Sequence, residues 1–169
     1  MSCCGPCSIA VFNANWHDYF DEISFYFNGD NFDTAEEYER RRVALKAVMD
    51  NFAQTHGPIT WINADYSPRV FQTCEECIHH RMLETAQYAA KNGYDCFSTT
   101  LTVSPHKRTD LVNGIGRGVA IITGVPFLSA NLKKKDGFKR TVEKSRELAV
   151  YRQNYCGCAR SRAKLDTCK

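Results

Sequence analysis

The cysteines are the residues of this chain best suited to chemistry. Nine occur in 169 residues, and six of them fall into three close groups. The groups are Cys3-Cys4, Cys74-x-x-Cys77 and Cys156-x-Cys158. Thiolates bind soft metals and also carry out thiol–disulfide exchange. Thiols this closely spaced at separate places predict a site assembled by folding, either a metal centre or a redox pair.

The first two groups supply four thiolates. Four is the number that holds a cubic iron–sulfur cluster or a closed tetrahedral zinc site. Structural zinc sites more often use two CxxC-like pairs, whereas Cys3 and Cys4 are adjacent, so the pattern favours iron–sulfur. A c-type haem is excluded, because Ile78 follows Cys77 where that motif has histidine. A thioredoxin-like dithiol at the start of a helix is the alternative for Cys74 and Cys77.

The third group differs in kind. Two cysteines separated by one residue close a disulfide only with strain, and strained exposed disulfides are the labile, catalytic ones. Gly157, between Cys156 and Cys158, supplies the backbone freedom that such closure needs. We expect a redox pair here, with two further metal ligands as the alternative.

The remaining cysteines and a histidine pair are less specific. Cys7 could cap the same site, ligate a second metal or open the first helix. Cys96 and Cys168 have no nearby partner in the sequence, and a lone cysteine is most often a small packing residue or an idle thiol. His79 and His80 follow the CxxC, where surface positions or contacts beside a ligand are expected.

Helix and strand patterns alternate along the chain. Thr34 and Glu37 have the spacing of a capping box before a long helix, and the CxxC lies at the entrance of the next helix. Strands are expected at 22–27, 59–64, 97–103 and 125–130, and further helices at 9–20, 109–124 and 138–151. The alternation predicts an α/β fold, a three-layer sandwich with a mainly parallel sheet that binds ligands at the strands' carboxyl ends. A strand is expected before Cys3, but only two residues precede it, so either the first strand is absent or the start of the chain has been clipped.

Length and charge narrow the class of protein. The length fits one domain, residues 1–169, with a proper core. No apolar run is long enough for a membrane helix and no leader is recognised, so we expect a cytoplasmic protein without a membrane partner. The net charge of +3 hides a basic segment, 131–169, with 12 Lys/Arg against 4 Asp/Glu. Such a segment suits a polyanion such as nucleic acid, or else is a solvated surface.

Several motifs together resemble the QueH-type epoxyqueuosine reductases. They occur in order from the third residue to about Ser161. The motifs are Cys-Cys-Gly-Pro-Cys-Ser at 3–8, Glu-Glu-Tyr-Glu-Arg-Arg at 36–41, the CxxC at 74–77, Ser-Thr-Thr-Leu-x-x-Ser-Pro-x-Lys at 98–107, Lys-Lys-Lys-Asp-Gly-Phe-Lys-Arg at 133–140 and Leu-Ala-Val-Tyr-Arg-Gln-x-Tyr-Cys-Gly-Cys at 148–158. The sequence departs from the family at 28–31, where Asn-Gly-Asp-Asn stands in place of Asn-Pro-Asn, and in lacking the strand before the double cysteine.

The resemblance implies a cytoplasmic enzyme of the HUP-like, Rossmann-like α/β class. It would reduce the epoxide of epoxyqueuosine at the wobble position of tRNA to queuosine, the final step of queuosine biosynthesis. It also implies a four-iron four-sulfur cluster and a redox-active disulfide. The implied ligands are Cys3, Cys4, Cys74 and Cys77, the implied disulfide is Cys156–Cys158, and Cys7 is a candidate ligand to an additional iron ion.

Reduction of an epoxide to water and an alkene needs two electrons and two protons. The thiol groups account for electron transfer, and an external electron donor must restore them. Polar residues near them are candidates for the proton donor, namely Asp95, His106 and Lys107. Basic residues are expected to contact the tRNA carrying epoxyqueuosine in its anticodon. They are Lys133, Lys134, Lys135, Lys139, Arg140 and Arg152.

Two other functions compete with this interpretation. One is a non-catalytic tRNA-binding module stabilised by zinc. The other is a thiol–disulfide oxidoreductase that acts on a protein. Metal and sulfide content distinguishes all three.

Overall fold

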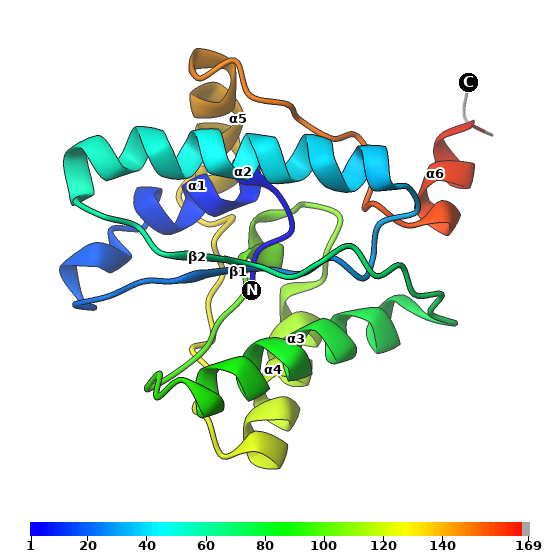
Figure 1. Ribbon diagram of the computed structural model, residues 1–169, viewed down its shortest axis with the longest axis horizontal. Helices are drawn as coiled ribbons and strands as arrows, with labels where there is room; N and C mark the ends of the chain where they lie inside the picture. Colours follow the sequence, from blue (N-terminus) through cyan, green and yellow to red (C-terminus); the bar gives the residue numbers. More distant parts are fainter. Residues whose placement is uncertain (167–169) are drawn as a thin grey trace.

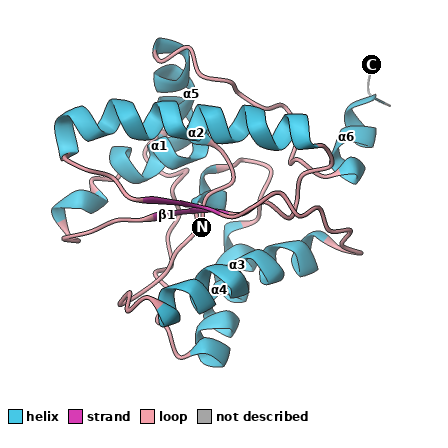
Figure 2. Cartoon of the chain, in the orientation of Figure 1, coloured by secondary structure: helices cyan, strands magenta, loops and turns pink. Residues whose placement is uncertain are grey.

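Helices cover both sides of a short pair of parallel strands (Figures 1 and 2). The computed structural model describes residues 1–166, so Cys168, expected to be an idle thiol, lies outside the described residues. α1 and α2 lie on one side of the strands, and α3 and α4 on the other (Figure 1). The elements are α1 (Gly5–Asn13), η1 (Trp16–Asp18), β1 (Phe25–Phe27), α2 (Ala35–His56), β2 (Trp61–Asn63), α3 (Cys74–Lys91), η2 (Thr100–Val103), α4 (Thr109–Thr123), α5 (Gly137–Glu147) and α6 (Ala159–Asp166).

The extended segments run parallel, but only two of them form a regular ladder in the described chain. β1 pairs with β2 in parallel, with Phe27 opposite Asn63. Two isolated parallel bridges supplement this ladder. Ser2 pairs with Phe27, the last residue of β1, and Phe97 pairs with Phe127. The chain is therefore mixed α/β with a small parallel sheet, which is the class that the alternating pattern predicted.

Side-chain capping explains why one predicted strand is wrong. Residues 97–103 were expected to be extended, but Thr100–Val103 is the 3₁₀ helix η2. The Thr99 hydroxyl accepts a hydrogen bond from the Leu101 amide at 3.1 Å, which turns the chain out of the strand. The predicted strand at 125–130 likewise contributes only the bridge at Phe127.

Residues in the left-handed region follow two helices that end earlier than predicted. The first helix was expected to continue to Phe20, but α1 ends at Asn13 and Asn15 has φ 54°. The last predicted helix, 138–151, ends at Glu147, and Ala149 has φ 49°. This second bend directs the chain toward the Cys156–Cys158 segment. The short helix α6 was not predicted.

The helix predicted from a capping box at Thr34 and the helix predicted to start at the CxxC are both confirmed. The Thr34 hydroxyl accepts from the Glu37 amide at 3.2 Å at the start of α2. At the start of α3, Thr73 and Glu76 form a reciprocal capping box. α3 therefore begins at Cys74, and its buried face, which includes Ile78, Met82 and Ala86, packs in the core shared with α4.

The backbones of α1 and α2 touch at Gly5, which predicts sensitivity to a single methyl group. A Cβ at Gly5 would lie 2.4 Å from the carbonyl oxygen of Ala44, and a backbone atom cannot rotate away. We expect Gly5→Ala to destabilise the protein by about 1–3 kcal/mol. Thermal unfolding measures the effect, which corresponds to a drop of roughly 2–4 °C per kcal/mol.

Gly114→Ala in α4 is the matched control. A Cβ there meets nothing within 4 Å, so this variant should be neutral or more stable by up to about 1 kcal/mol. Equal melting temperatures for the Gly5 variant and the wild type would contradict the close packing of α1 on α2.

Candidate metal and redox centre

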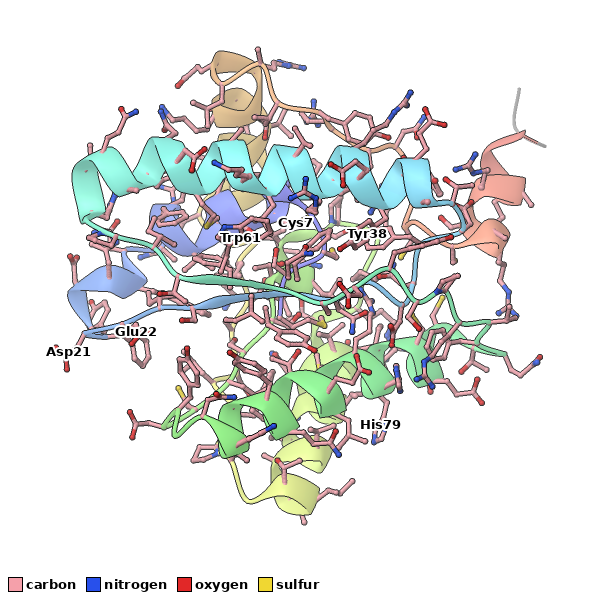
Figure 3. All side chains as sticks on the ribbon, in the orientation of Figure 1. Cys7, Asp21, Glu22, Tyr38, Trp61 and His79 are labelled. Carbon is pink, nitrogen blue, oxygen red and sulfur yellow. The ribbon has the colours of Figure 1, made fainter. Side chains whose placement is uncertain are left out.

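Three thiols gather where the chain enters α1. The Sγ atoms of Cys3, Cys4 and Cys7 all lie within 4.8 Å of one another. Cys3 and Cys4 are buried, and Cys7, which Figure 3 labels, is partly buried. Cys4 is the N-cap of α1, and its sulfur accepts a hydrogen bond from the Cys7 amide at 3.3 Å. The start of the helix thus sets the geometry of the three sulfur atoms.

The three thiols differ in how readily they ionise. Hydrogen bonds from Cys4 and Cys7 hold the pKa of Cys3 well below its usual range, against the opposing effect of burial. Burial, and then the hydrogen bond to Cys3, raise the pKa of Cys4 to about 12. The pKa of Cys7 lies well above its ordinary value, because its hydrogen bond to Cys3, and then that to Cys4, favours the neutral thiol. Cys3 is therefore the first of the three to become a thiolate, the form that binds metals.

Gln153 connects these thiols to the distant end of the chain. Its Nε2 lies 2.9 Å from Cys4 Sγ and 4.0 Å from Cys7 Sγ, and donates toward both. Its Oε1 is buried and has no hydrogen-bond partner among the described residues. Sequence analysis missed this role. The only signal was the position of Gln153 three residues before Cys156.

The other two cysteine groups share one cavity of about 260 Å³. Cys74, Cys77, Cys156 and Cys158 line it, and all four are free thiols. Cys77 is buried on α3, whereas Cys74, the first residue of that helix, is exposed. Burial raises the pKa of Cys77, and Arg81 partly opposes this effect. Folding thus brings the CxxC and the Cys156–Cys158 pair together, as a shared site requires.

A buried ion pair on α2 anchors the segment that carries Cys156. Arg41 Nε donates to Glu37 Oε1 at 2.6 Å, and both side chains are almost fully buried. The other two guanidinium nitrogens of Arg41 donate to the carbonyl oxygens of Tyr155 at 3.0 Å and of Cys156 at 3.1 Å. Gly157 has φ 118°, a conformation that favours glycine.

Asn31 and Arg81 join the cavity wall to this segment. Asn31 Nδ2 donates to the Cys156 carbonyl oxygen at 3.3 Å, while its Oδ1 accepts from Arg81 Nη1 at 3.2 Å. Arg81 is completely buried and lines the cavity. Neither residue was identified from the sequence, although Arg81 follows Cys77 by one helical turn and so lies on the same face of α3.

Of the three candidate proton donors, Lys107 lies at the cavity. Burial opposes its charge, but Cys156 and Cys74 outweigh that effect and raise the pKa of Lys107. Asp95 and His106 are exposed and do not line the cavity. Lys107 is therefore cationic at neutral pH and close to the thiols.

The basic residues expected to contact tRNA are mostly exposed. Lys133 is the exception, because its Nζ donates to the Lys107 carbonyl oxygen at 2.7 Å and so supports the cavity wall. Arg140 donates to the Asn13 carbonyl oxygen at 2.7 Å. The exposed members are Lys134, Lys135, Lys139, Arg140 and Arg152.

Two further expectations concern residues outside this centre. Cys96 lies apart from the other thiols, beside a smaller cavity of about 120 Å³. His79 projects from α3 into solvent (Figure 3). His80 instead bonds Asp30 Oδ2 at 2.6 Å, with Glu84 Oε1 3.3 Å away.

Among the described helices, none is both long and apolar enough to cross a membrane.

Known proteins that are similar to this chain share the name of one reductase family. A family model described as epoxyqueuosine reductase QueH matches residues 1–164. A protein of that name from Streptococcus pyogenes serotype M1 is 32% identical over 171 residues, covering 92% of this chain and 66% of the relative. The chain thus spans just under two thirds of that relative.

Other relatives of the same name are covered more fully. The protein from Thermotoga maritima is 34% identical over 169 residues, covering 92% of this chain and 85% of the relative. The protein from Dehalococcoides mccartyi is 32% identical over 165 residues, covering 94% of this chain and 88% of the relative. The chain belongs to the epoxyqueuosine reductase QueH family, a family of oxidoreductases of queuosine biosynthesis.

Proposed function

We propose that this chain reduces the epoxide of epoxyqueuosine in tRNA to the alkene of queuosine, using a metal centre and a separate dithiol. In this reaction both carbon–oxygen bonds of the epoxide break, and its oxygen leaves as water after taking up two electrons and two protons. Oxidation of the dithiol to a disulfide releases two electrons and two protons. An external electron donor in the cytoplasm then reduces the disulfide.

The arrangement of the thiols is the observation that carries this proposal. Seven of the eight described cysteines lie either in the trio at the start of α1 or around the cavity, and only Cys96 lies elsewhere. Gln153 and Arg81 contact residues of these two groups. Packing cysteines would have no reason to gather in this way.

The residues present fit a bound metal group. All donors are sulfur atoms, the ligand type of iron–sulfur clusters. Two buried polar atoms beside them, Gln153 Oε1 and Arg81 Nη2, have no partner in the described chain. A cluster would supply one-electron transfer close to the substrate. We assign its four ligands to Cys3, Cys4, Cys74 and Cys77, with Cys7 available to an additional iron ion.

The remaining groups have distinct tasks. Cys156 and Cys158 form the dithiol, held over the cavity by Arg41. Lys107 faces that cavity and is the candidate to donate a proton to the epoxide oxygen or to stabilise its developing charge. The exposed lysines of 133–139, with Arg140 and Arg152, are assigned to the phosphates of the tRNA. No protein substrate or zinc-stabilised module is needed to explain these contacts.

Metal content tests the cluster assignment. Protein purified without oxygen should contain about four irons and four sulfides per chain. Cys77→Ser should lose most of both, because a ligand is removed, whereas Cys96→Ser should retain them. Iron, zinc and acid-labile sulfide are measured on the same samples. One zinc per chain without sulfide would instead support a mononuclear site at Cys3, Cys4 and Cys7.

The dithiol is tested by Cys156→Ser. This variant should keep the iron and sulfide of the wild type but lose turnover, since one half of the redox pair is gone. Conversion of epoxyqueuosine to queuosine in tRNA is followed by nucleoside mass spectrometry, and Cys96→Ser serves as the active control. Loss of the metal in Cys156→Ser would show that Cys156 is a ligand.

The salt dependence of binding tests the tRNA contacts. Replacing Lys134 and Lys135 with Ala should weaken binding, and each lost phosphate contact should reduce the slope of log K against log salt concentration by about 1. Lys133 is left unchanged because it supports Lys107. Lys91→Ala is the control, at the far end of α3, about 15 Å along the helix axis from Arg81, the last residue of α3 that lines the cavity. Equal slopes in all three proteins would make the lysine loop a solvated surface.

A further inference from the structure

Two arginines of this protein are completely or almost completely buried, and they differ in how their charge is balanced. Arg41 is 1% exposed and Arg81 is 0% exposed. Arg41 is paired with the carboxylate of Glu37 at 2.6 Å. Arg81 forms no ion pair with any carboxylate of the described residues, and its partners are the Cys77 carbonyl oxygen at 3.3 Å and the amide oxygen of Asn31.

Arg81 is also incompletely hydrogen-bonded. Its Nη2 is buried and has no partner in the described part of the chain. Removing a charged group from water is expensive unless a counter-charge and hydrogen bonds replace the solvent. A buried guanidinium with no carboxylate partner and one unpaired nitrogen is therefore expected to have a partner that the polypeptide alone does not provide.

The thiols become the anionic groups available to Arg81 when a bound metal ionises them. It lines the cavity that contains Cys77 and Cys156, and it lies one turn after Cys77 on α3. The pKa values agree with this placement, because burial lowers the pKa of Arg81 but Cys77, Cys3 and Cys156 raise it further. Cys3 belongs to the trio and Cys77 to the cavity, so Arg81 acts on both groups.

We propose that Arg81 is the counter-charge of the metal centre, so that its guanidinium stabilises the thiolate-bound group and raises the reduction potential of that group. The inference rests on the metal centre proposed above. Reduction adds negative charge, which a nearby cation stabilises. Arg41 differs from Arg81 because the carboxylate of Glu37 already supplies its counter-charge. Arg81 is thus a positioning residue that sets the reduction potential through its charge and is not itself a ligand.

The experiment compares metal-loaded protein with Arg81→Met, which has a similar length and no charge. We expect the midpoint potential of the metal centre to fall by about 59 mV, a tenfold change in the ratio of reduced to oxidised protein for one electron. Iron release to a chelator should be about tenfold faster. Arg81→Lys keeps the charge, so its potential should stay close to that of the wild type.

The control removes one positive charge at a distance from the centre, from the exposed last residue of α3. In Lys91→Met, both the midpoint potential and the rate of iron release should equal those of the wild type. An unchanged potential in Arg81→Met, or an equal fall in Arg81→Lys, would overturn the role of Arg81 while leaving the metal centre intact. Wild-type protein without metal would overturn both the centre and this inference.

Discussion

The geometry of the centre depends on the buried ion pair between Arg41 and Glu37. Chain connectivity does not hold the thiols together, since Cys4 and Gln153 are 149 positions apart. Arg41 instead fixes the distant segment on α2, because it donates hydrogen bonds to the carbonyl oxygens of Tyr155 and Cys156. Glu37 accepts a hydrogen bond from Arg41 Nε and so holds the guanidinium in place. α2 is therefore the rigid support on which the redox pair is placed.

The same pair fixes more than one point of the segment. The Tyr151 hydroxyl donates to Glu37 Oε2 at 2.8 Å, so Glu37 holds the start of the segment and Arg41 holds its end. Between these anchors, Gln153 is directed toward the sulfur atoms of Cys4 and Cys7. Removing one charge of a buried pair typically costs about 3–5 kcal/mol, because the other charge is left without its partner. The position of the dithiol is thus coupled to the stability of the fold.

Local patterns in the sequence predicted the parts of the fold that local contacts determine. The α/β class, the capped start of α2 and the helix beginning at the CxxC were all confirmed. The strand predicted at 97–103 failed because Thr99 satisfies a backbone amide that a strand would have paired with its neighbour. Propensity cannot reveal this competition, since threonine favours strands as well as such turns.

The site was predicted less completely because its grouping is tertiary. Spacing identified the cysteines that matter, but it could not show that the CxxC shares a cavity with Cys156 and Cys158. Arg81 and Gln153 were missed for the same reason, since an arginine or glutamine has no distinctive spacing until its contacts are known. The unbalanced charge of Arg81 is recognised only from two observations together, its complete burial and the absence of an ion pair to any carboxylate of the described residues.

The two places where the chain offers thiols to a metal are built alike. Cys4 and Cys7 have the same spacing as Cys74 and Cys77, and both pairs lie at the start of a helix. Residues three apart lie on one face of a helix, so each pair presents its sulfur atoms together. Partial positive charge at a helix N-terminus stabilises thiolates. Helix ends thus orient the ligands, but burial still raises the pKa of Cys4 and of Cys77. Arg81 provides the full positive charge that the helix ends lack.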